Sequence, residues 1–421
     1  MRHRVLIVGG GFGGLAAAKA LKRAPVEVTL VDRANHHLFQ PLLYQVASGL
    51  LTETEIAPPL RGVLRRQHNA RVLLAEVTGF DLAARAVEAT APDGEPLTLG
   101  YDSLIVAAGA SGGMKTLDDA RDVRSRVLRA FELAELAADE DERAAWLRFA
   151  VVGGGPTGIE LAGQVAELAQ RTLRRDYRRI DTGAAKISLL EGGSWLLADF
   201  PEPLRSRAAA DLAELGVEVW LRAGVVGVDD EGVDLAVGQR IPARTVIWAA
   251  GVHASPLAEA LADASGGALD RQGRIDVDEE LTLPGHPEVF AIGDMARVDG
   301  VPGVAPAAMQ QGRYAARTIR RRLQDETAGR PFRYRDKGRL AVIGRRRALG
   351  TALGIRFRGR IALAVWAVVH IRYLVGWGNR FVTVTRWLWS LLARDRGQRV
   401  ISPGPLTDLS KIAPTTEPVT I

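Results

Sequence analysis

The sequence contains no cysteine among its 421 residues. Disulfide bonds, thiolate metal sites and any redox relay through a cysteine pair are therefore excluded. The seven histidines lack the spacing of a metal site, and the adjacent His36 and His37 would point to opposite faces of a strand. We therefore predict that the protein binds no metal ion.

The sequence also lacks a hydrophobic run long enough to cross a membrane. Its longest charge-free run in the most apolar region, 361–371, has 11 residues, whereas a spanning helix needs about 20. An apolar strand is predicted within the first few residues, which leaves no room for a signal peptide. We therefore expect the protein to remain in the cytoplasm.

Acidic residues are scarce between residues 335 and 400, where two Asp accompany 15 Lys or Arg. The whole chain has a net charge of +6, so the remainder is acidic and the basic character is local. A local excess of positive charge indicates a surface that binds an anionic partner.

Glycine is abundant, and the glycines within residues 4–32 have the spacing that is found in dinucleotide-binding units. An apolar strand leads into a G-x-G-x-x-G loop, a helix rich in Ala and Leu follows, and a second strand ends at Asp32. The first glycine permits a tight turn, the second lets the backbone approach a pyrophosphate, and the third lets the helix pack on the strand. The predicted parts are the strand 5–8, the glycines Gly9, Gly11 and Gly14, the helix 15–21 and the strand 27–31.

The same order of elements returns in the middle of the chain, where the second strand ends at Glu191. Two such units predict two dinucleotides bound by one chain. A glycine-rich turn without a ligand, or a duplicated fold with one empty site, remains the alternative. The predicted parts are the strand 149–152, the glycines Gly153, Gly155 and Gly158, a helix to about residue 175 and the strand 186–190.

The rest of the chain contains further apolar strands that end in small residues, as strands beside a cofactor do. We predict a small meander from strands 72–77 and 86–89, and a helical stretch over 116–146. Other predicted strands are 101–108, 217–220, 225–228, 245–250 and 288–294, and a helix is predicted over 306–323.

Residues 359–393 hold four of the eight tryptophans and alternate apolar runs with arginines. This pattern predicts two amphipathic helices that lie in an anionic membrane surface. The alternative is that they cover the core or form a buried dimer interface. The final residues, 402–421, are rich in Pro and Thr and are predicted to be disordered.

Taken together, these motifs resemble the type II NADH:quinone oxidoreductases, of the two-dinucleotide-binding flavoprotein superfamily. The resemblance runs over 4–401 and is carried by VGGGFGGLAAAKAL, LVDRANHHLFQPLLYQVASG, VVGGGPTGIELAG, VIWAAGV, VFAIGD and RFRGRIALAVWAVVHIRYLVGWGNRF. It implies an α/β fold with two Rossmann-like domains, for FAD and NADH, and a C-terminal amphipathic-helix region at the membrane surface. The expected domains are 1–113 with 249–330 for FAD, 114–248 for NADH, 331–401 for the membrane and 402–421 as a disordered tail.

The resemblance also implies roles for individual residues. Glu160 would lie near the nicotinamide, although a carboxylate favoured by the helix dipole is the alternative. Lys337 would lie near the flavin, and Gln310 would belong to the quinone pocket. A carboxylate at Glu191 would repel a 2′-phosphate and so favour NADH over NADPH. Non-covalent FAD would be held by Gly9, Gly11, Gly13, Gly14, Asp32, Gln45, Val46, Gly109, Ala110, Gly293 and Asp294, and NADH by Gly153, Gly155, Gly158, Glu191 and Gly251.

Two features depart from the family pattern. Pro306 occupies the place of the first Gln in the motif A-Q-x-x-x-Q, and the loop after Gly109 is short and lacks an aromatic Tyr-Phe-Gly. The implied activity is non-proton-pumping transfer of a hydride from NADH to FAD and then of two electrons to menaquinone or ubiquinone. The implied location is the cytoplasmic face of the cell membrane, as a peripheral protein and possible homodimer.

Two other activities fit the same motifs. One is a soluble NADH-dependent flavin reductase with another acceptor, and the other is a redox sensor that binds FAD and NADH without turnover. Nucleic-acid binding by the basic tail is not expected, because the tail has apolar Trp-rich faces and no nucleic-acid module.

Overall fold

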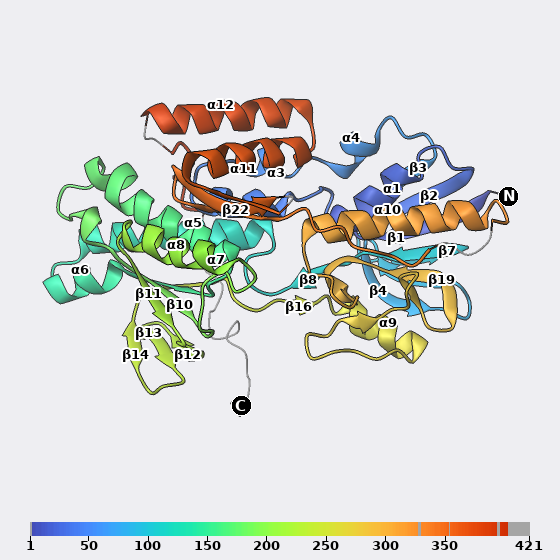
Figure 1. Ribbon diagram of the computed structural model, residues 1–421, viewed down its shortest axis with the longest axis horizontal. Helices are drawn as coiled ribbons and strands as arrows, with labels where there is room; N and C mark the ends of the chain where they lie inside the picture. The colour runs from blue at the N-terminus through green and yellow to red at the C-terminus, as the bar shows by residue number, and fades with distance from the viewer. Residues whose placement is uncertain (1, 327–329, 353, 394–395, 403–421) are drawn as a thin grey trace. The chain divides into compact units, whose positions relative to one another are not determined.

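The computed structural model describes residues 2–326, 330–352, 354–393 and 396–402 (Figure 1). These residues form two compact units, each assembled from three separate pieces of chain. Unit 1 contains residues 1–38, 57–111 and 252–337, and unit 2 contains residues 39–56, 112–251 and 338–421. The predicted disordered tail lies, apart from residue 402, outside the described residues. The domain limits implied by the resemblance stay a prediction.

Unit 1 is built on a six-stranded sheet in the order β18-β19-β7-β1-β2-β3, parallel except for β18. The last four residues of β1 are all buried, as expected for a parallel strand covered on both faces. This confirms the predicted first strand, helix and second strand. The sheet strands are β1 His3–Val8, β2 Val26–Asp32, β3 Ala70–Leu74, β7 Ser103–Val106, β18 Thr282–Leu283 and β19 His286–Ala291.

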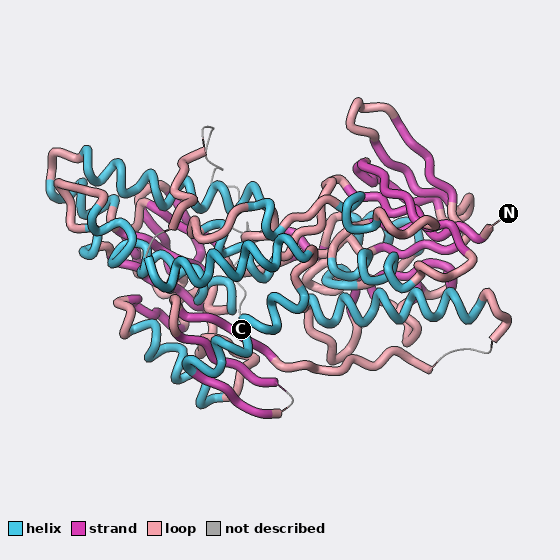
Figure 2. The backbone as a smooth tube through the Cα atoms, turned by 90° about the horizontal axis from the view of Figure 1, so that it is seen from above, coloured by secondary structure: helices cyan, strands magenta, loops and turns pink. Residues whose placement is uncertain are grey.

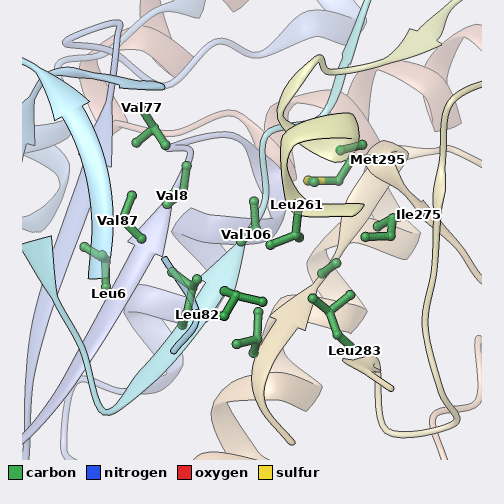
Figure 3. Packing of buried hydrophobic residues seen from close by; sticks show 14 of the residues in the cluster. Leu6, Val8, Val77, Leu82, Val87, Val106, Leu261, Ile275, Leu283 and Met295 are labelled. Carbon is green, nitrogen blue, oxygen red and sulfur yellow. The ribbon is translucent and has the colours of Figure 1, made fainter. Parts of the chain in front are cut away.

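Helices cover one face of this sheet. Helix α1 (Phe12–Ala20) packs against α10 (Ala305–Arg322), the long helix on the right in Figures 1 and 2. An antiparallel meander of β4 (Glu76–Asp81), β5 (Ala86–Thr90) and β6 (Pro96–Gly100) covers the other face with α9 (Leu257–Ser265). A hydrophobic core cluster of unit 1 lies between this sheet, the meander and α9, where Leu6 and Val8 meet residues such as Val87 and Leu261 (Figure 3).

The single strand predicted over 72–77 is wrong. The structure has two strands there, because the chain breaks at Ala75 and turns from the edge of the parallel sheet into the meander. Ala75 is buried, and its N–H donates to the carbonyl of Asp32. The smaller elements of unit 1 are α4 Leu60–Leu64, β8 Ala110–Ser111, β16 His253–Ala254, β17 Ile275–Asp276 and β20 Ala296–Arg297.

Unit 2 repeats the same plan with a four-stranded parallel sheet in the order β11-β10-β9-β15. Helices α5, α7 and α8 pack on the sheet, and a second core lies between the sheet and an antiparallel meander of β12, β13 and β14. The bounds are β9 Arg148–Val152, β10 Lys186–Glu191, β11 Val217–Leu221, β12 Val225–Asp229, β13 Gly232–Leu235, β14 Arg240–Pro242, β15 Thr245–Trp248, α5 Leu117–Leu136, α6 Glu140–Trp146, α7 Pro156–Glu167 and α8 Glu202–Ala213.

A third sheet in unit 2 was not predicted from the sequence. It is antiparallel and consists of β21 (Arg339–Ile343), β22 (Arg347–Ala352) and β23 (Ile355–Arg358). β21 packs against α7, and β22 packs against α11. The sheet therefore separates the nucleotide-binding fold of unit 2 from its C-terminal helices.

The C-terminal region forms α11 (Gly359–Tyr373) and α12 (Trp377–Ala393), so the prediction of two helices over 359–393 is confirmed. One side of α11 is buried at Ala362 and Trp366, whereas Trp377, Phe381 and Leu392 of α12 are 83%, 72% and 81% exposed. No helix in the described ranges is both long and apolar enough to cross a membrane. Unit 2 also contains two short helices from the segment 39–56, α2 (Leu43–Ala47) and α3 (Glu53–Ile56).

Candidate functional site

The first glycine loop, between β1 and α1, has three glycines with three different surroundings. Gly9 has φ +99°, and a Cβ there would stand 2.4 Å from the carbonyl oxygen of Ala107. A Cβ on Gly14 would stand 1.9 Å from the carbonyl oxygen of Gly9, so only glycine lets α1 pack this closely. Gly11 has nothing within 4 Å of its Cβ position. The open space lies at the second glycine, where a pyrophosphate approaches the backbone in this motif.

Asp32, at the end of β2, lies beside this loop. Its carboxylate accepts hydrogen bonds from the N–H groups of Gly10 and, at 2.7 Å, of Ala34. Burial raises the pKa of Asp32, while these two hydrogen bonds oppose the rise. Each oxygen keeps a lone pair for a further donor. The side chain is thus fixed where a ribose hydroxyl could donate to it.

The second glycine loop, between β9 and α7, repeats this geometry in unit 2. Gly153 has φ +110°, and a Cβ on Gly158 would stand 1.8 Å from the carbonyl oxygen of Gly153. Gly155 again has nothing within 4 Å of its Cβ position. Pro156 begins α7 at its first turn, where the missing N–H costs nothing. Both loops therefore leave room for a dinucleotide at the N-terminus of a helix.

Glu191 takes the place in unit 2 that Asp32 takes in unit 1. Its carboxylate accepts from the N–H groups of Gly154 and Gly193, both at 2.6 Å. In both units, therefore, the acid accepts one hydrogen bond from the glycine loop, at Gly10 or Gly154. It accepts a second hydrogen bond from the residue two positions after it, Ala34 or Gly193. This repeat argues against the alternative of one degenerate, empty nucleotide fold.

The loop after Glu191 contains a residue that sequence reasoning missed. The N–H of Leu197 donates to the carbonyl of Gly154 at 2.9 Å, so the loop folds back on the glycines. Trp195 on this loop is 45% exposed, and the guanidinium carbon of Arg205 lies 4.7 Å from its ring centre. An exposed aromatic ring beside the acid that is predicted to bind the ribose can stack on a base. Its signal in the sequence was a lone Trp four positions after the acid.

The Gly-Asp pair after β19 forms a short turn in unit 1. Gly293 has φ +78°, and its N–H donates to the buried side chain of Gln311 at 2.7 Å. Gln310, predicted to belong to the quinone pocket, instead exchanges two hydrogen bonds of 3.0 Å with the backbone of Arg335. Asp294 lines a small hollow beside this turn. The structure therefore brings Gln311, rather than Gln310, to the Gly-Asp turn, and a quinone role for Gln310 stays a prediction.

The other predicted cofactor residues lie at turns of the two units. Gly109 has φ +72°, and its carbonyl accepts from the N–H of Ser255 at 3.1 Å, while Ala110 pairs with Ala254 between β8 and β16. Gly251 has φ +60° and nothing near its Cβ position. The remaining predicted residues are Gly13 on α1, which packs against Ile292, and Lys337, which is exposed at the end of unit 1.

Glu160 lies on α7, deep in unit 2. Burial raises its pKa well above the usual value, although the N–H of Val342 on β21 donates to it at 3.3 Å. The role near the nicotinamide and the alternative of a carboxylate favoured by the helix dipole both stay predictions. Burial also raises the pKa of the neighbouring Tyr44 hydroxyl, and Glu160 adds to the rise.

Unit 2 contains a cavity of about 750 Å³ bounded largely by apolar side chains of α11 and α12. Its polar edge is formed by Gln45, whose side chain donates to the Tyr44 hydroxyl at 3.0 Å and accepts from the indole N–H of Trp387 at 2.7 Å. Gln45 was predicted to contact the cofactor, and the structure shows it lining this cavity. The adjacent Val46 is fully buried.

Arg396 follows α12 and lies buried against α7 within unit 2. This side chain is 3% exposed and donates to the carbonyls of Ser48 and Gln164, at 3.1 and 3.3 Å. Its guanidinium lies 3.8 Å from the buried carboxylate of Glu167. Burial lowers the pKa of Arg396 to about 10, with Glu167 opposing the change. Arg396 thus fastens the C-terminal segment to α7 and to the segment that carries Gln45.

Comparison with known proteins places this chain in a family. The model of the pyridine nucleotide-disulphide oxidoreductase family matches residues 3–312. A type II NADH:quinone oxidoreductase of Mycobacterium tuberculosis is 46% identical over 420 residues, covering 95% of this chain and 90% of the relative. The chain belongs to the type II NADH:quinone oxidoreductase family. The predictions of this family, of the fold and of FAD and NADH as cofactors are thereby confirmed.

More distant proteins resemble this member of the family in sequence or in fold. A demethylphylloquinone reductase of Synechocystis is 30% identical, covering 92% of this chain and 96% of the relative. The solved structure of NDH2 from Plasmodium falciparum matches with a TM-score of 0.84 at 20% identity, covering 96% and 100% of the two chains. The disulphide chemistry in the name of the broader family has no counterpart here, because this type II oxidoreductase has no cysteine.

Proposed function

We propose that the protein oxidises NADH and reduces a membrane quinone without pumping protons, using non-covalent FAD. The observation that carries the proposal is the repeated nucleotide loop, with open space at Gly11 in unit 1 and at Gly155 in unit 2. FAD, which the first loop and Asp32 would hold, would supply the two-electron chemistry that takes a hydride from NADH and reduces the quinone. The experiment that tests this is reduction of the purified flavoprotein by NADH and its reoxidation by a quinone.

The chain itself contributes binding, orientation and electrostatics. Unit 1 holds FAD through the first loop and Asp32, with the Gly-Asp turn fixed by Gln311. Unit 2 would hold NADH through the second loop and Glu191, and Glu160 would place a buried carboxyl of raised pKa near the nicotinamide. A carboxyl whose pKa is raised by burial is a candidate for hydrogen bonding or proton transfer beside a cofactor.

The cavity of unit 2 is proposed to take the quinone. An isoprenoid chain is apolar, and the walls contributed by α11 and α12 are apolar as well. Tyr44, Gln45 and Gln164 are among the polar residues of the lining and could orient a quinone carbonyl. Pockets for such ligands combine apolar walls with a few polar groups in this way. Menaquinone and ubiquinone both fit this chemistry.

The exposed apolar side chains of α12 support docking on a membrane. Trp377, Phe381 and Leu392 are all more than two-thirds exposed, and the region around them is strongly basic. Such helices lie in the headgroup layer of anionic membranes. We therefore propose a peripheral position on the cytoplasmic face of the membrane, where a quinone with a long tail is available. A homodimer formed through part of this surface is the alternative use of α12.

Glu191 is proposed to set the preference for NADH over NADPH. Its carboxylate would accept hydrogen bonds from the ribose diol and repel a 2′-phosphate. Glu191→Ala should lower the ratio of kcat/KM for NADH to that for NADPH. The corresponding change in free energy should be on the order of 1–3 kcal/mol, the range for charge-assisted hydrogen bonds. Steady-state assays with both nucleotides measure this ratio, and the exposed Glu202→Ala on α8 serves as control. An unchanged ratio in Glu191→Ala would mean that Glu191 does not contact the ribose.

A further inference from the structure

Three segments of unit 1 form a continuous surface. Helices α1 and α10 touch so closely that a Cβ on Gly312 would stand 2.1 Å from the carbonyl oxygen of Gly13 (Figures 1 and 2). The chain after α4 is tied to the end of α1, because Gln67 donates to the carbonyl of Ala18 at 2.8 Å and Asn69 donates to that of Leu21 at 3.0 Å. We call this surface the basic layer, defined as residues 12–26, 57–70 and 305–324.

The basic layer contains no acidic residue. It holds eleven Lys or Arg, and all of them are exposed. The rest of unit 1 has the opposite balance, with 12 Lys or Arg against 21 Asp or Glu. The positive charge is therefore gathered on one surface of a nearly neutral unit. The eleven residues are Lys19, Lys22, Arg23, Arg61, Arg65, Arg66, Arg313, Arg317, Arg320, Arg321 and Arg322.

Most of these cations make no ion pair within the described residues. Within the described ranges, two of the five arginines on α10 are paired with acids: Arg321 with Glu326 and Arg322 with Glu280. Arg313, Arg317 and Arg320 follow the helical spacing of four and three residues and stand on one exposed stripe. Like charges at this spacing repel one another, so the stripe costs stability unless an anion binds there.

We propose that the basic layer binds the anionic headgroups of a lipid bilayer and is a second membrane contact, separate from α11 and α12. This proposal rests on the membrane docking proposed above. A bilayer presents many phosphates in one plane, which suits cations distributed over three segments of one surface. Single-stranded nucleic acid would favour aromatic platforms. The only Phe, Tyr or Trp rings in the basic layer, those of Phe12 and Tyr314, are half-buried and buried. Lipid is therefore the favoured partner.

The contact would hold the FAD-binding unit on the membrane as well as the helices of unit 2. Each cation near an anionic surface strengthens binding about fivefold, the equivalent of about 1 kcal/mol, and the gain falls with salt. Three cations would together contribute roughly a hundredfold at low salt. The apolar side chains of α12, in contrast, bind neutral and anionic bilayers alike.

The test compares full-length variants in flotation with phosphatidylglycerol-containing vesicles and with neutral phosphatidylcholine vesicles, at several salt concentrations. The basic-layer variant is Arg313→Gln, Arg317→Gln and Arg320→Gln combined. The control is Arg2→Gln, Arg85→Gln and Arg271→Gln, which removes the same charge from exposed sites elsewhere in unit 1. A third variant, Trp389→Ser with Leu392→Ser, reduces the apolar surface of α12.

We expect the basic-layer variant to lose tens-fold to about a hundredfold in affinity for anionic vesicles at low salt. It should keep its affinity for neutral vesicles and show a smaller dependence on salt. The α12 variant should weaken on both kinds of vesicle, and the control should weaken little. NADH oxidation with a water-soluble acceptor verifies that each variant is folded.

If the basic-layer variant and the control lose affinity equally, the second contact is overturned while docking through α12 stands. If the wild-type chain does not float with anionic vesicles at all, membrane docking itself fails. If the basic-layer substitutions instead weaken binding to a nucleic-acid oligomer and leave flotation unchanged, the partner assignment is wrong.

Discussion

Gly11→Val is expected to yield folded protein without its yellow flavin. Gly11 has φ −67° and ψ −163°, an extended conformation that valine adopts readily, and no atom lies within 4 Å of its Cβ position. The fold therefore does not require glycine here, whereas a bound pyrophosphate does. The methyl groups of the valine should weaken the binding of FAD by about 1.4 kcal/mol or more. We therefore expect the flavin content of the purified protein to fall by at least tenfold. Circular dichroism verifies that the protein is folded.

Gly155→Val is the matched variant in unit 2. Gly155 has φ −73° and ψ 179° and an equally open Cβ position. This protein should remain yellow, but NADH should no longer reduce its flavin at ordinary concentrations. The two variants together separate the two nucleotide sites. Normal flavin content in Gly11→Val, or normal reduction by NADH in Gly155→Val, would contradict the assignment of the corresponding loop.

Arg396→Ala is expected to lower the free energy of unfolding by about 3–5 kcal/mol, the cost of removing one partner of a buried ion pair. The substitution would leave the carboxylate of Glu167 buried beside two carbonyls that lose their donor. The structure would also lose the connection between the C-terminal segment and the residues around Ser48. Chemical denaturation monitored by tryptophan fluorescence measures this difference.

Arg399→Ala provides the control on the same segment. Arg399 pairs with Asp176, but both side chains are about a third exposed or more, and such surface pairs contribute only about 0–1 kcal/mol. If Arg396→Ala costs no more than Arg399→Ala, Arg396 does not fasten the C-terminal segment. A large effect of Arg396→Ala alone would support that role.

The nucleotide loops could be predicted from the sequence because their signals are local. Strand, glycines, helix and terminal acid follow one another within about 30 residues in unit 1, and each part has its own chemical requirement. The prediction extended to Asp32 and Glu191, which the structure places beside the two loops. Both acids also bond to backbone N–H groups that no sequence pattern indicates.

Features that depend on contacts between distant segments could not be predicted in this way. The sheet of β21, β22 and β23 was missed because three consecutive arginines, residues 345–347, and several glycines obscure the alternation of its strands. The predicted strand over 72–77 was wrong because only the tertiary structure breaks the chain at Ala75. Gln310 and Gln311 differ by one position on α10, and the orientation of the helix decides which is buried.

The cavity of unit 2 illustrates the same limit. Its walls come from the segment 39–56, from α7, from the sheet after Gly338 and from both C-terminal helices. The apolar character of residues 359–393 was evident in the sequence, which favoured a membrane surface over helices that cover the core or form a buried dimer interface. The structure shows that the same helices also enclose a cavity and that Trp387 meets Gln45 there.

An anaerobic titration of the purified protein with NADH, followed by a short-chain quinone, tests the central proposal most directly. We predict that one equivalent of NADH bleaches the flavin absorbance and that the quinone restores it within the time of turnover. Bleaching that only a water-soluble dye reverses would contradict the quinone as acceptor and favour a soluble flavin reductase. A flavin that NADH does not bleach would contradict an NADH dehydrogenase altogether and favour a sensor that binds both nucleotides without turnover.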